Sequence, residues 1–256
     1  MPTLTIDELA VSVPEGATVL QAVRLAGAPL LTLCHWDGLP PYGACRLCLV
    51  EVWQDAGHSQ IVAACTHPVS EGLQVATRTP QAVALRRLML EFLLARSPTS
   101  GVIRDLAARE GITAIRFASA ASGGRPDALC ILCGLCVRVC RDLVGAAAIG
   151  FTGRGAGRAV AAPFRIQAEA CIGCGACAAV CPTGAVRIED VAGQRFLRTW
   201  DTVVPLRPCP GCGQPHAPEP MAFLAGLADT SEHLWGFCPA CRRKAAAQAV
   251  SAIRPA

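Results

Sequence analysis

Sixteen cysteines constrain this chain of 256 residues more than any other feature. They recur as C-x-x-C units, which suit metal chelation in a reducing compartment better than a disulfide framework. The start of the sequence, residues 1–13, lacks the basic region and apolar core of a signal peptide. All sixteen cysteines fall into four groups of four, and none is left over. We therefore expect a cytoplasmic protein whose folding depends on bound metal.

The first group has the spacing C-x10-C-x2-C-x16-C and is called the N-terminal quartet: Cys34, Cys45, Cys48 and Cys65. A long loop, a pair on a tight turn and a distant fourth ligand can surround two sulfide-bridged irons. The small residues Gly43 and Ala44 would let backbone amides approach the sulfurs. The first gap is wider than in plant-type ferredoxins. The quartet predicts a [2Fe–2S] cluster, with a structural zinc site as the alternative.

Two near-identical repeats, C-x2-C-x2-C-x3-C, begin at Cys130 and Cys171. In two-cluster ferredoxins three close cysteines hold one [4Fe–4S] cluster, and the fourth binds the other cluster. Glycines inside the repeats permit the backbone turns that this wrapping needs. The first cubane quartet is therefore predicted to be Cys130, Cys133, Cys136 and Cys181. The second cubane quartet is predicted to be Cys171, Cys174, Cys177 and Cys140. Zinc sites and redox disulfides are weaker alternatives.

The last four cysteines form two C-P-x-C turns with the overall spacing C-x2-C-x25-C-x2-C. Four thiolates on two tight turns suit a closed tetrahedral zinc site. A rubredoxin-like single iron is the alternative, because the spacing is the same for both metals. His216 and His233 lie nearby in sequence and are redundant as ligands. This C-terminal quartet comprises Cys209, Cys212, Cys238 and Cys241.

The rest of the sequence predicts an α+β protein of four domains. Residues 1–78 contain a strand hairpin (3–6 and 9–13), a helix capped by Thr18, and strands at 49–53, 61–64 and 73–76, which is the order of a β-grasp [2Fe–2S] domain. The other three are a helical connector at 79–126, a two-cluster ferredoxin-like domain at 127–195 and a zinc-ribbon-like module at 203–256.

The helical connector is predicted to begin at Thr79-Pro80, a cap residue followed by proline at the first helical position. Six apolar residues are expected to form the core face of its first helix: Val83, Leu85, Leu88, Leu90, Phe92 and Leu93. A second helix is expected at residues 102–109, ending at Gly111, and residues 118–126 read as a linker.

Charge and hydropathy weaken the case for two functions. The formal charge is +4, but iron–sulfur and zinc sites would contribute about −8, which leaves about −4. Basicity therefore gives no support to nucleic-acid binding. The apolar stretch at residues 168–186 contains four cysteines, so cluster binding explains it better than a membrane span.

Longer motifs carry a resemblance to a known family. The segments LCH at 33–35, PYGACRLCLVE at 41–51 and AACT at 63–66 resemble one group of [2Fe–2S] domains. That group includes the large iron–sulfur subunit of respiratory complex I, the diaphorase small subunit of NAD-reducing hydrogenases, and NAD-linked formate dehydrogenases. The likeness covers roughly residues 3–189. It implies that His35 packs or hydrogen-bonds beside the cluster without ligating it.

The resemblance implies an oxidoreductase subunit for electron transport. Its partners would be an NAD(P)H-oxidising flavoprotein and a hydrogenase or formate dehydrogenase catalytic subunit, in a hetero-oligomer. Plain transfer and electron bifurcation both remain open.

The sequence contains no proton-transfer or nucleophilic constellation, which indicates a non-catalytic subunit. The alternative is a zinc and iron–sulfur module that binds nucleic acid, supported only by the C-terminal turns with Arg242 and Arg243.

The sequence departs from the resembled family at one place. The family usually has a further [4Fe–4S] cluster there, held by one histidine and three cysteines. This chain reads ARSPTSG at residues 95–101, with Ser97 and Ser100 at the positions of a cysteine pair and no histidine. Serine is a poor cluster ligand. We predict that this additional cluster is absent.

Overall fold

The computed structural model describes the chain except residues 55–56, 115, 118–128, 167, 222–235 and 253–256. It divides into two compact units. Unit 1 comprises residues 1–139, 151–160 and 180–185, and unit 2 comprises residues 140–150, 161–179 and 186–256. The boundary between residues 139 and 140 separates Cys140 from the other three cysteines of the first repeat. The boundary between residues 179 and 180 separates Cys181 from the other three cysteines of the second repeat. The predicted linker at 118–126 lies outside the described residues.

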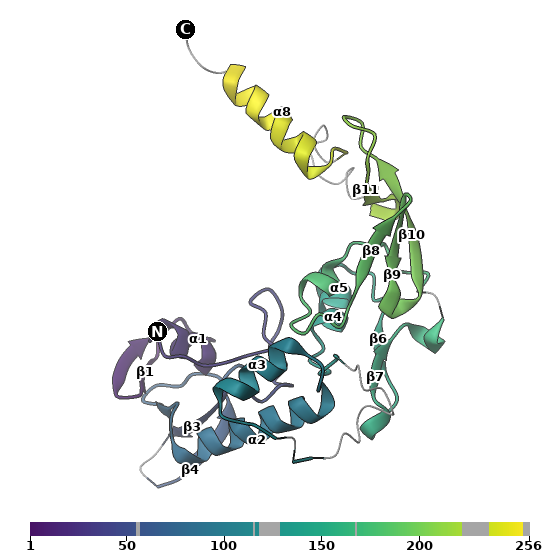
Figure 1. Ribbon diagram of the computed structural model, residues 1–256. Helices are drawn as coiled ribbons and strands as arrows, with labels where there is room; N and C mark the ends of the chain where they lie inside the picture. Colours follow the sequence, from purple (N-terminus) through teal and green to yellow (C-terminus); the bar gives the residue numbers. More distant parts are fainter. Residues whose placement is uncertain (55–56, 115, 118–128, 167, 222–235, 253–256) are drawn as a thin grey trace. The chain divides into compact units, whose positions relative to one another are not determined.

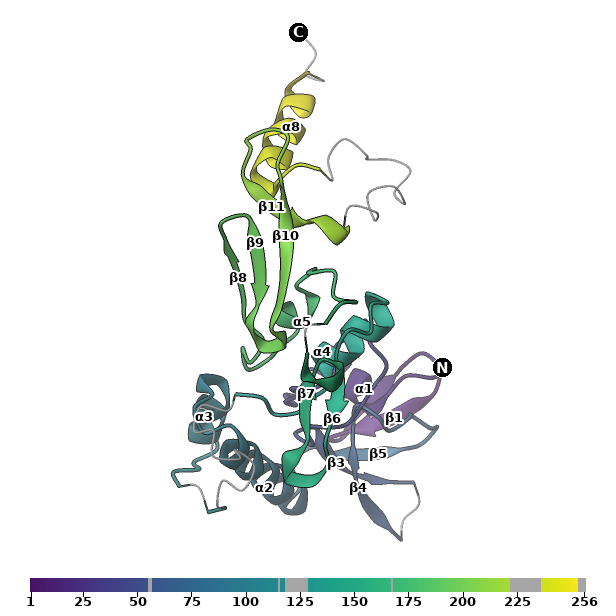
Figure 2. The same ribbon diagram turned by 90° about the vertical axis from the view of Figure 1, so that its right-hand side faces the viewer.

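A mixed five-stranded sheet forms the centre of the N-terminal region in unit 1. Its order is β2-β1-β5-β3-β4, with β1 parallel to β5 and every other neighbouring pair antiparallel. The strands are β1 Thr3–Ile6, β2 Leu9–Ser12, β3 Leu49–Trp53, β4 Ser59–Ala63 and β5 Gln74–Ala76. Figure 2 shows β1, β5, β3 and β4 together in this sheet. The predicted hairpin and strands are confirmed, with small differences at their ends.

The turn between β1 and β2 has two residues with left-handed backbone, Asp7 at φ 44° and Glu8 at φ 75°. Two-residue hairpins need this conformation because it matches the twist of the flanking strands. The Asp7 carboxylate accepts hydrogen bonds from the Thr77 backbone N–H (2.7 Å) and hydroxyl (2.5 Å). The hairpin is thereby fastened to the end of β5.

Helix α1, Val19–Leu25, packs against the sheet and closes its core. Thr18 begins it as predicted: its hydroxyl accepts from the Gln21 backbone N–H, and the Gln21 side chain accepts from the Thr18 N–H. This reciprocal capping satisfies two donors that a helix start leaves free. The core it shares with the sheet includes Leu4, Ile6, Leu20, Val50 and Val75.

Two helices follow the sheet, α2 Pro80–Arg96 and α3 Gly101–Arg109, and they contact each other (Figure 1). Thr79 caps α2 as predicted, and Arg86 of α2 donates to the carbonyls of Leu49 and Thr77, at 2.7 Å each. These bonds fix α2 to the ends of β3 and β5.

The predicted core face of α2 is wrong at Phe92, which is 45% exposed and stacks on Phe117. The preceding residue, Glu91, is buried instead. Arg116 forms an ion pair with Glu91 at 2.6 Å, and this pairing makes the inward position of a carboxylate tolerable.

Short elements carry the cysteine repeats. Helix α4, Leu135–Arg138, contains Cys136 and continues into a π-helical turn, η2 Val139–Leu143, which contains Cys140. Helix α5, Ala176–Ala179, contains Cys177. Strands β6 Gly150–Thr152 and β7 Ala159–Ala161 pair with each other between the repeats. Single 3-10 turns lie at η3 Gly155–Gly157, η4 Pro163–Arg165 and η6 Glu219–Met221.

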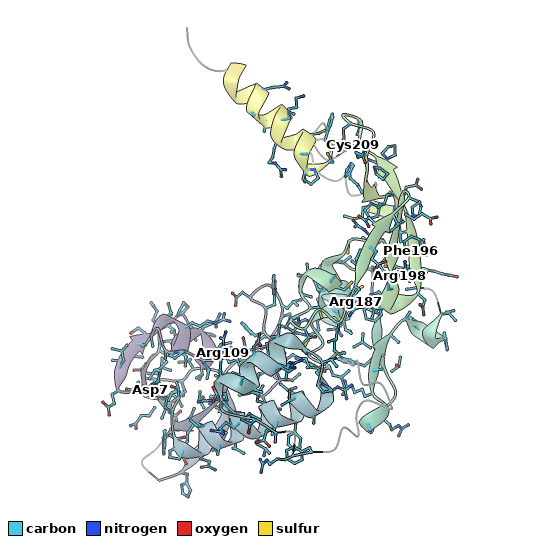
Figure 3. All side chains as sticks on the ribbon, in the orientation of Figure 1. Asp7, Arg109, Arg187, Phe196, Arg198 and Cys209 are labelled. Carbon is cyan, nitrogen blue, oxygen red and sulfur yellow. The ribbon has the colours of Figure 1, made fainter. Side chains whose placement is uncertain are left out.

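Unit 2 also contains a four-stranded antiparallel sheet of order β11-β10-β9-β8 (Figure 1). Its strands are β8 Ile188–Val191, β9 Gln194–Leu197, β10 Thr202–Pro208 and β11 Pro215–Pro218. The 3-10 turn η5, Arg198–Trp200, joins β9 to β10. The guanidinium of Arg198, on η5, lies 4.6 Å from the centroid of the Phe196 ring, on β9, and Figure 3 labels both residues.

Helix α8, Pro239–Ala252, begins directly after Cys238. Proline at its first position costs no hydrogen bond, because that N–H has no partner within a helix. Within the described part of the chain, no helix combines the length and the apolar character needed to span a membrane.

Candidate metal centres

The N-terminal quartet is gathered around the end of the first sheet. Its two outer cysteines come from the α1–β3 loop (Cys34) and from the residue pair after β4 (Cys65), while Cys45 and Cys48 lie just before β3. All four are buried, between 0% and 4% exposed. The sulfurs of Cys34 and Cys45 lie 3.3 Å apart, and the Cys45 backbone N–H donates to the Cys34 sulfur at 3.3 Å. The loop thus brings distant cysteines into one group.

The thiols of this quartet cannot ionise independently. Hydrogen bonds from the Cys45 and Cys65 side chains lower the pKa of Cys34 to about 2. The same bonds, with burial, raise the pKa values of Cys45 and Cys65. A thiolate at one position therefore opposes ionisation of its neighbours. Positive metal ions remove this conflict by stabilising every thiolate, so the donor set fits a bound iron centre.

Backbone conformation shapes the loop around Cys45. Gly43 has φ +68°, and a Cβ there would lie 3.1 Å from the Thr66 side chain. Arg46, between Cys45 and Cys48, has φ +56° although it carries a side chain. Such strain is tolerated where the surrounding structure enforces it, and it recurs at functional sites. His35 is placed beside the quartet, with Nε2 3.0 Å from an Asp37 carboxylate oxygen.

The first cubane quartet lies entirely in unit 1. Burial raises the pKa of Cys130 and raises that of Cys133 to about 12, and the negative charge of Cys181 adds to both shifts. Cys181 is therefore near the first repeat although fifty-one positions separate it from Cys130 in the sequence. Leu132 has φ +55°, and its N–H points to the Cys130 sulfur at 3.4 Å. The structure thus places Cys181 near Cys130 and Cys133.

Arg138 connects two of these cysteine sites within unit 1. It lies on α4, two residues after Cys136, and is only 5% exposed. Its guanidinium donates to the carbonyl of Cys34 at 2.7 Å and to the carbonyl of Pro40 at 2.5 Å. It also lies 5.1 Å from the centroid of the Tyr42 ring. The cysteine spacing did not predict this role of Arg138, although an arginine inside the apolar segment between Cys136 and Cys140 was a signal.

The second cubane quartet lies entirely in unit 2 and lines one cavity. Burial raises the pKa of Cys171 and raises that of Cys177 to about 11, and the negative charge of Cys140 adds to both. Apolar residues complete the cavity wall, including Ile149, Leu197 and Trp200. The cysteine lining and the apolar wall suit a cofactor held by sulfur and kept from water.

The C-terminal quartet forms a tight group whose four sulfurs all lie within 4.8 Å of one another. Cys209 follows β10, as Figure 3 shows, and Cys238 precedes α8. The Cys238 N–H donates to the Cys209 sulfur at 3.2 Å, and the Cys241 N–H donates to the Cys238 sulfur at 3.5 Å. This spacing of four sulfurs fits a closed four-coordinate site.

The two turns of the C-terminal quartet leave little room. A Cβ at Gly211 would lie 3.0 Å from the Phe237 ring and 3.1 Å from the Cys241 sulfur. His216 is occupied elsewhere, because its Nε2 lies 2.8 Å from the Gly236 carbonyl oxygen. The other predicted neighbour, His233, lies outside the described residues.

Ser97 and Ser100 lie between α2 and α3, and both are fully buried. The Ser97 N–H donates to the Leu93 carbonyl at the end of α2. The Ser100 hydroxyl caps α3 by accepting from the Ile103 N–H at 3.5 Å. Ser100 thus caps α3, whereas the buried Ser97 hydroxyl has no hydrogen-bond partner among the described residues.

Comparison with known proteins identifies two domains. Residues 1–80 match the family described as a 2Fe-2S iron-sulfur cluster binding domain, and residues 129–185 match the 4Fe-4S dicluster domain. The protein is therefore an iron–sulfur protein with both kinds of domain on one chain, and the predicted [2Fe–2S] and [4Fe–4S] cofactor types are confirmed at this level.

Individual relatives show which iron–sulfur proteins this chain resembles. The chain is 32% identical to the NADH-ubiquinone oxidoreductase 75 kDa subunit of Reclinomonas americana, over 60% of this chain and 25% of that protein. It is 31% identical to NADP-reducing hydrogenase subunit HndD of Solidesulfovibrio fructosivorans, over 73% of this chain and 36% of that protein. The matched region thus spans only about a quarter to a third of these relatives.

A solved structure is matched over a larger share. One chain in the crystal structure of NAD+-reducing [NiFe]-hydrogenase in the H2-reduced state is 33% identical, with a TM-score of 0.53. The match covers 63% of this chain and 74% of that one. This protein belongs to the same family of iron–sulfur subunits of NAD(P)-linked oxidoreductases, and the predicted resemblance is confirmed.

Proposed function

We propose that this chain relays electrons between an NAD(P)H-oxidising flavoprotein and a catalytic subunit of the hydrogenase or formate dehydrogenase type, within a cytoplasmic hetero-oligomer. One observation carries the proposal: three cysteine quartets, each suited to an iron–sulfur cluster, lie in a chain related to subunits of such complexes. Bound clusters would supply one-electron redox chemistry, at about −400 mV for a plant-type centre.

The ligand assignment is also part of the proposal. The N-terminal quartet would hold the [2Fe–2S] cluster, and each cubane quartet would hold one [4Fe–4S] cluster. Support for exchanging the fourth ligands comes from the charge effects of Cys181 on Cys133 and of Cys140 on Cys171. Each exchanged quartet also falls within a single unit. Uncrossed repeats would instead divide each quartet between the two units.

In this relay, the protein would hold two redox sites close together and shield them from water. The charge of Cys34 raises the pKa of Cys133, so the N-terminal and first cubane quartets are neighbours in unit 1. Arg138 holds the Cys34 carbonyl from a helix of the first repeat. A buried cation of this kind also offsets the negative charge that thiolate sites accumulate. These contacts support electron exchange between the two sites.

The C-terminal quartet is proposed to hold zinc as a structural ion in a zinc-ribbon-like module. Four thiolate ligands on two tight turns complete a tetrahedral set and leave no ligand position open, which supports this role. We further propose a β-grasp fold for residues 1–78, a ferredoxin-like fold for residues 127–195, and loss of the additional histidine- and cysteine-bound cluster at Ser97 and Ser100.

A reduction assay tests the relay. Anaerobically purified protein is mixed with NADH, with or without an NADH-oxidising flavoprotein, while the [2Fe–2S] EPR signal is recorded. We expect reduction only in the presence of the flavoprotein. Reduction by NADH alone, or none with any flavoprotein despite full iron content, would contradict the proposal. Salt-dependent binding to DNA would instead favour a nucleic-acid module.

A further inference from the structure

Trp200 lies on the wall of the cavity that the second cubane quartet lines, but it comes from outside the dicluster domain. It is the last residue of η5 and is only 4% exposed. The Thr202 hydroxyl fixes its backbone by donating to the Trp200 carbonyl at 2.9 Å and accepting from the Ala168 N–H at 3.1 Å. The Trp200 backbone is thus linked through Thr202 to the segment that leads into Cys171.

The indole N–H of Trp200 is buried without an ordinary acceptor. Among the residues that the structure describes, no atom accepts a hydrogen bond from it, and the nitrogen is shielded from solvent. Leaving such a donor unpaired is unfavourable, so a buried indole N–H usually faces a partner. The position on the cavity wall makes a cysteine sulfur the available partner.

That sulfur belongs to Cys177. Burial raises the pKa of the Cys177 thiol and the Trp200 side chain lowers it, which places the indole beside this sulfur in the cavity that both residues line. A thiolate is a stronger acceptor than a thiol, because its charge attracts the donor. Metal ligation fixes cysteine as thiolate, so the contact would strengthen when the site is loaded.

We propose that Trp200 donates a hydrogen bond to the Cys177 thiolate and thereby raises the reduction potential of the [4Fe–4S] cluster held by the second cubane quartet. The inference rests on the proposed function, because it requires a cluster at that quartet. A donor aimed at a ligand sulfur stabilises the added negative charge of the reduced state more than the oxidised state. The residue acts through Cys177 and is therefore a positioning and tuning residue.

A second group near this site, Arg195, is a weaker source of the same effect. Its guanidinium donates to the Gly173 carbonyl at 2.9 Å, next to Cys174. Two further bonds of 2.8 Å bind it to both carboxylate oxygens of Asp190, which offsets its charge. Arg195 fastens the loop, whereas the Trp200 N–H has no competing acceptor of that kind among the described residues.

The test is an EPR-monitored redox titration of the whole protein carrying W200F. This substitution removes the N–H and keeps an aromatic ring. We expect the midpoint potential of one [4Fe–4S] cluster to become more negative, with the other [4Fe–4S] cluster and the [2Fe–2S] cluster unchanged. The matched control is Leu197→Val, which alters packing in the same cavity without touching a hydrogen bond. It should move the potential less than W200F does.

A second variant separates the hydrogen bond from ring size. Replacing Trp200 with 3-benzothienylalanine keeps the bicyclic shape and exchanges the N–H for sulfur, so the same negative shift is expected. In unsubstituted protein, tryptophan labelled with ¹⁵N in the indole ring should give a hyperfine coupling to the reduced cluster. Unchanged potentials at full iron content, or no ¹⁵N coupling, would overturn the role of Trp200. A wild-type iron content short by one [4Fe–4S] cluster would instead overturn the proposed function.

Discussion

The N-terminal and C-terminal quartets use the same four side chains in opposite settings. In the N-terminal quartet all four cysteines are at most 4% exposed and surround the end of a sheet with its own apolar core. In the C-terminal quartet only Cys209 is buried, whereas Cys212 is exposed and Cys238 and Cys241 are half-buried. One site is built into a core, and the other lies at the surface between β10 and α8.

This difference in burial implies that the bound metal has a different role in each region. Apolar surroundings and buried backbone amides set the potential of a redox centre, so a site that carries electrons benefits from a rigid core. A surface site without such a core depends on the ion for its fold. The N-terminal region should therefore keep most of its fold when the C-terminal metal is lost. Four predictions probe this comparison, in order of decreasing effect.

The largest effect is expected from Cys238→Ser. Structural zinc contributes about 10–16 kcal/mol of apparent binding free energy in small modules, so removing a ligand should unfold the segment around α8. Hydrogen exchange should show loss of protection in β10, β11 and α8, with protection in β1–β5 unchanged. Loss of iron together with zinc would show that the two regions are not independent.

Arg138→Met should destabilise the N-terminal region substantially. It removes two buried bonds from a charged donor to the carbonyls of Cys34 and Pro40, for a cost of about 3–5 kcal/mol. The denaturant midpoint for loss of the [2Fe–2S] visible circular dichroism should fall. Arg138→Lys, which keeps the charge but cannot bridge both carbonyls as a planar fork, should recover part of the loss. Equal midpoints in all three proteins would refute this account of Arg138.

Gly211→Ala should weaken the C-terminal site without abolishing it. The added Cβ would press on the Phe237 ring and the Cys241 sulfur, at 3.0 and 3.1 Å. We expect zinc affinity, measured by competition with a chelator, to fall about 10- to 100-fold, as for other changes beside metal ligands. Gly236→Ala is the matched control, because its Cβ would meet Pro210 at an ordinary 3.7 Å. Similar losses in both variants would point away from the tight turn.

The smallest effect is expected from Thr18→Ala, which removes the capping pair at the start of α1. The free energy of unfolding of the N-terminal region should fall by about 1 kcal/mol. Exposed Glu15→Gln is the control and should stay within about 0.5 kcal/mol of the unsubstituted protein. A large loss of zinc in Thr18→Ala would contradict the separation of the two regions.

Local features were predictable from sequence, and distant contacts were not. Thr18, Thr79 and the strand at Leu49–Trp53 follow from caps and patterns within a few residues. Phe92 was misplaced because the inward position of Glu91 depends on Arg116, twenty-five residues away. The cysteine sites show the same limit on prediction. The spacing of their ligands is visible within short stretches of sequence, whereas the residues that surround the ligands come from distant parts of the chain.

Arg138 and Trp200 show this limit most clearly. The contacts of Arg138 join it to residues 98 and 104 positions earlier. Trp200 reaches the second cubane quartet because η5 joins β9 and β10, the two central strands of the sheet, in a stretch (residues 196–202) to which the sequence pattern assigned no domain. Both residues surround ligands that were easy to predict, but their own roles depend on tertiary structure.

Metal analysis combined with EPR on anaerobically purified protein tests the central claim most directly, namely three iron–sulfur sites and one structural zinc site. We predict about ten iron atoms and one zinc ion per chain, with signals from one [2Fe–2S] and two [4Fe–4S] clusters. About fourteen iron atoms would mean that a further cluster is bound despite Ser97 and Ser100, and about eleven with no zinc would make the C-terminal quartet a rubredoxin-like iron site. Either result would contradict the account.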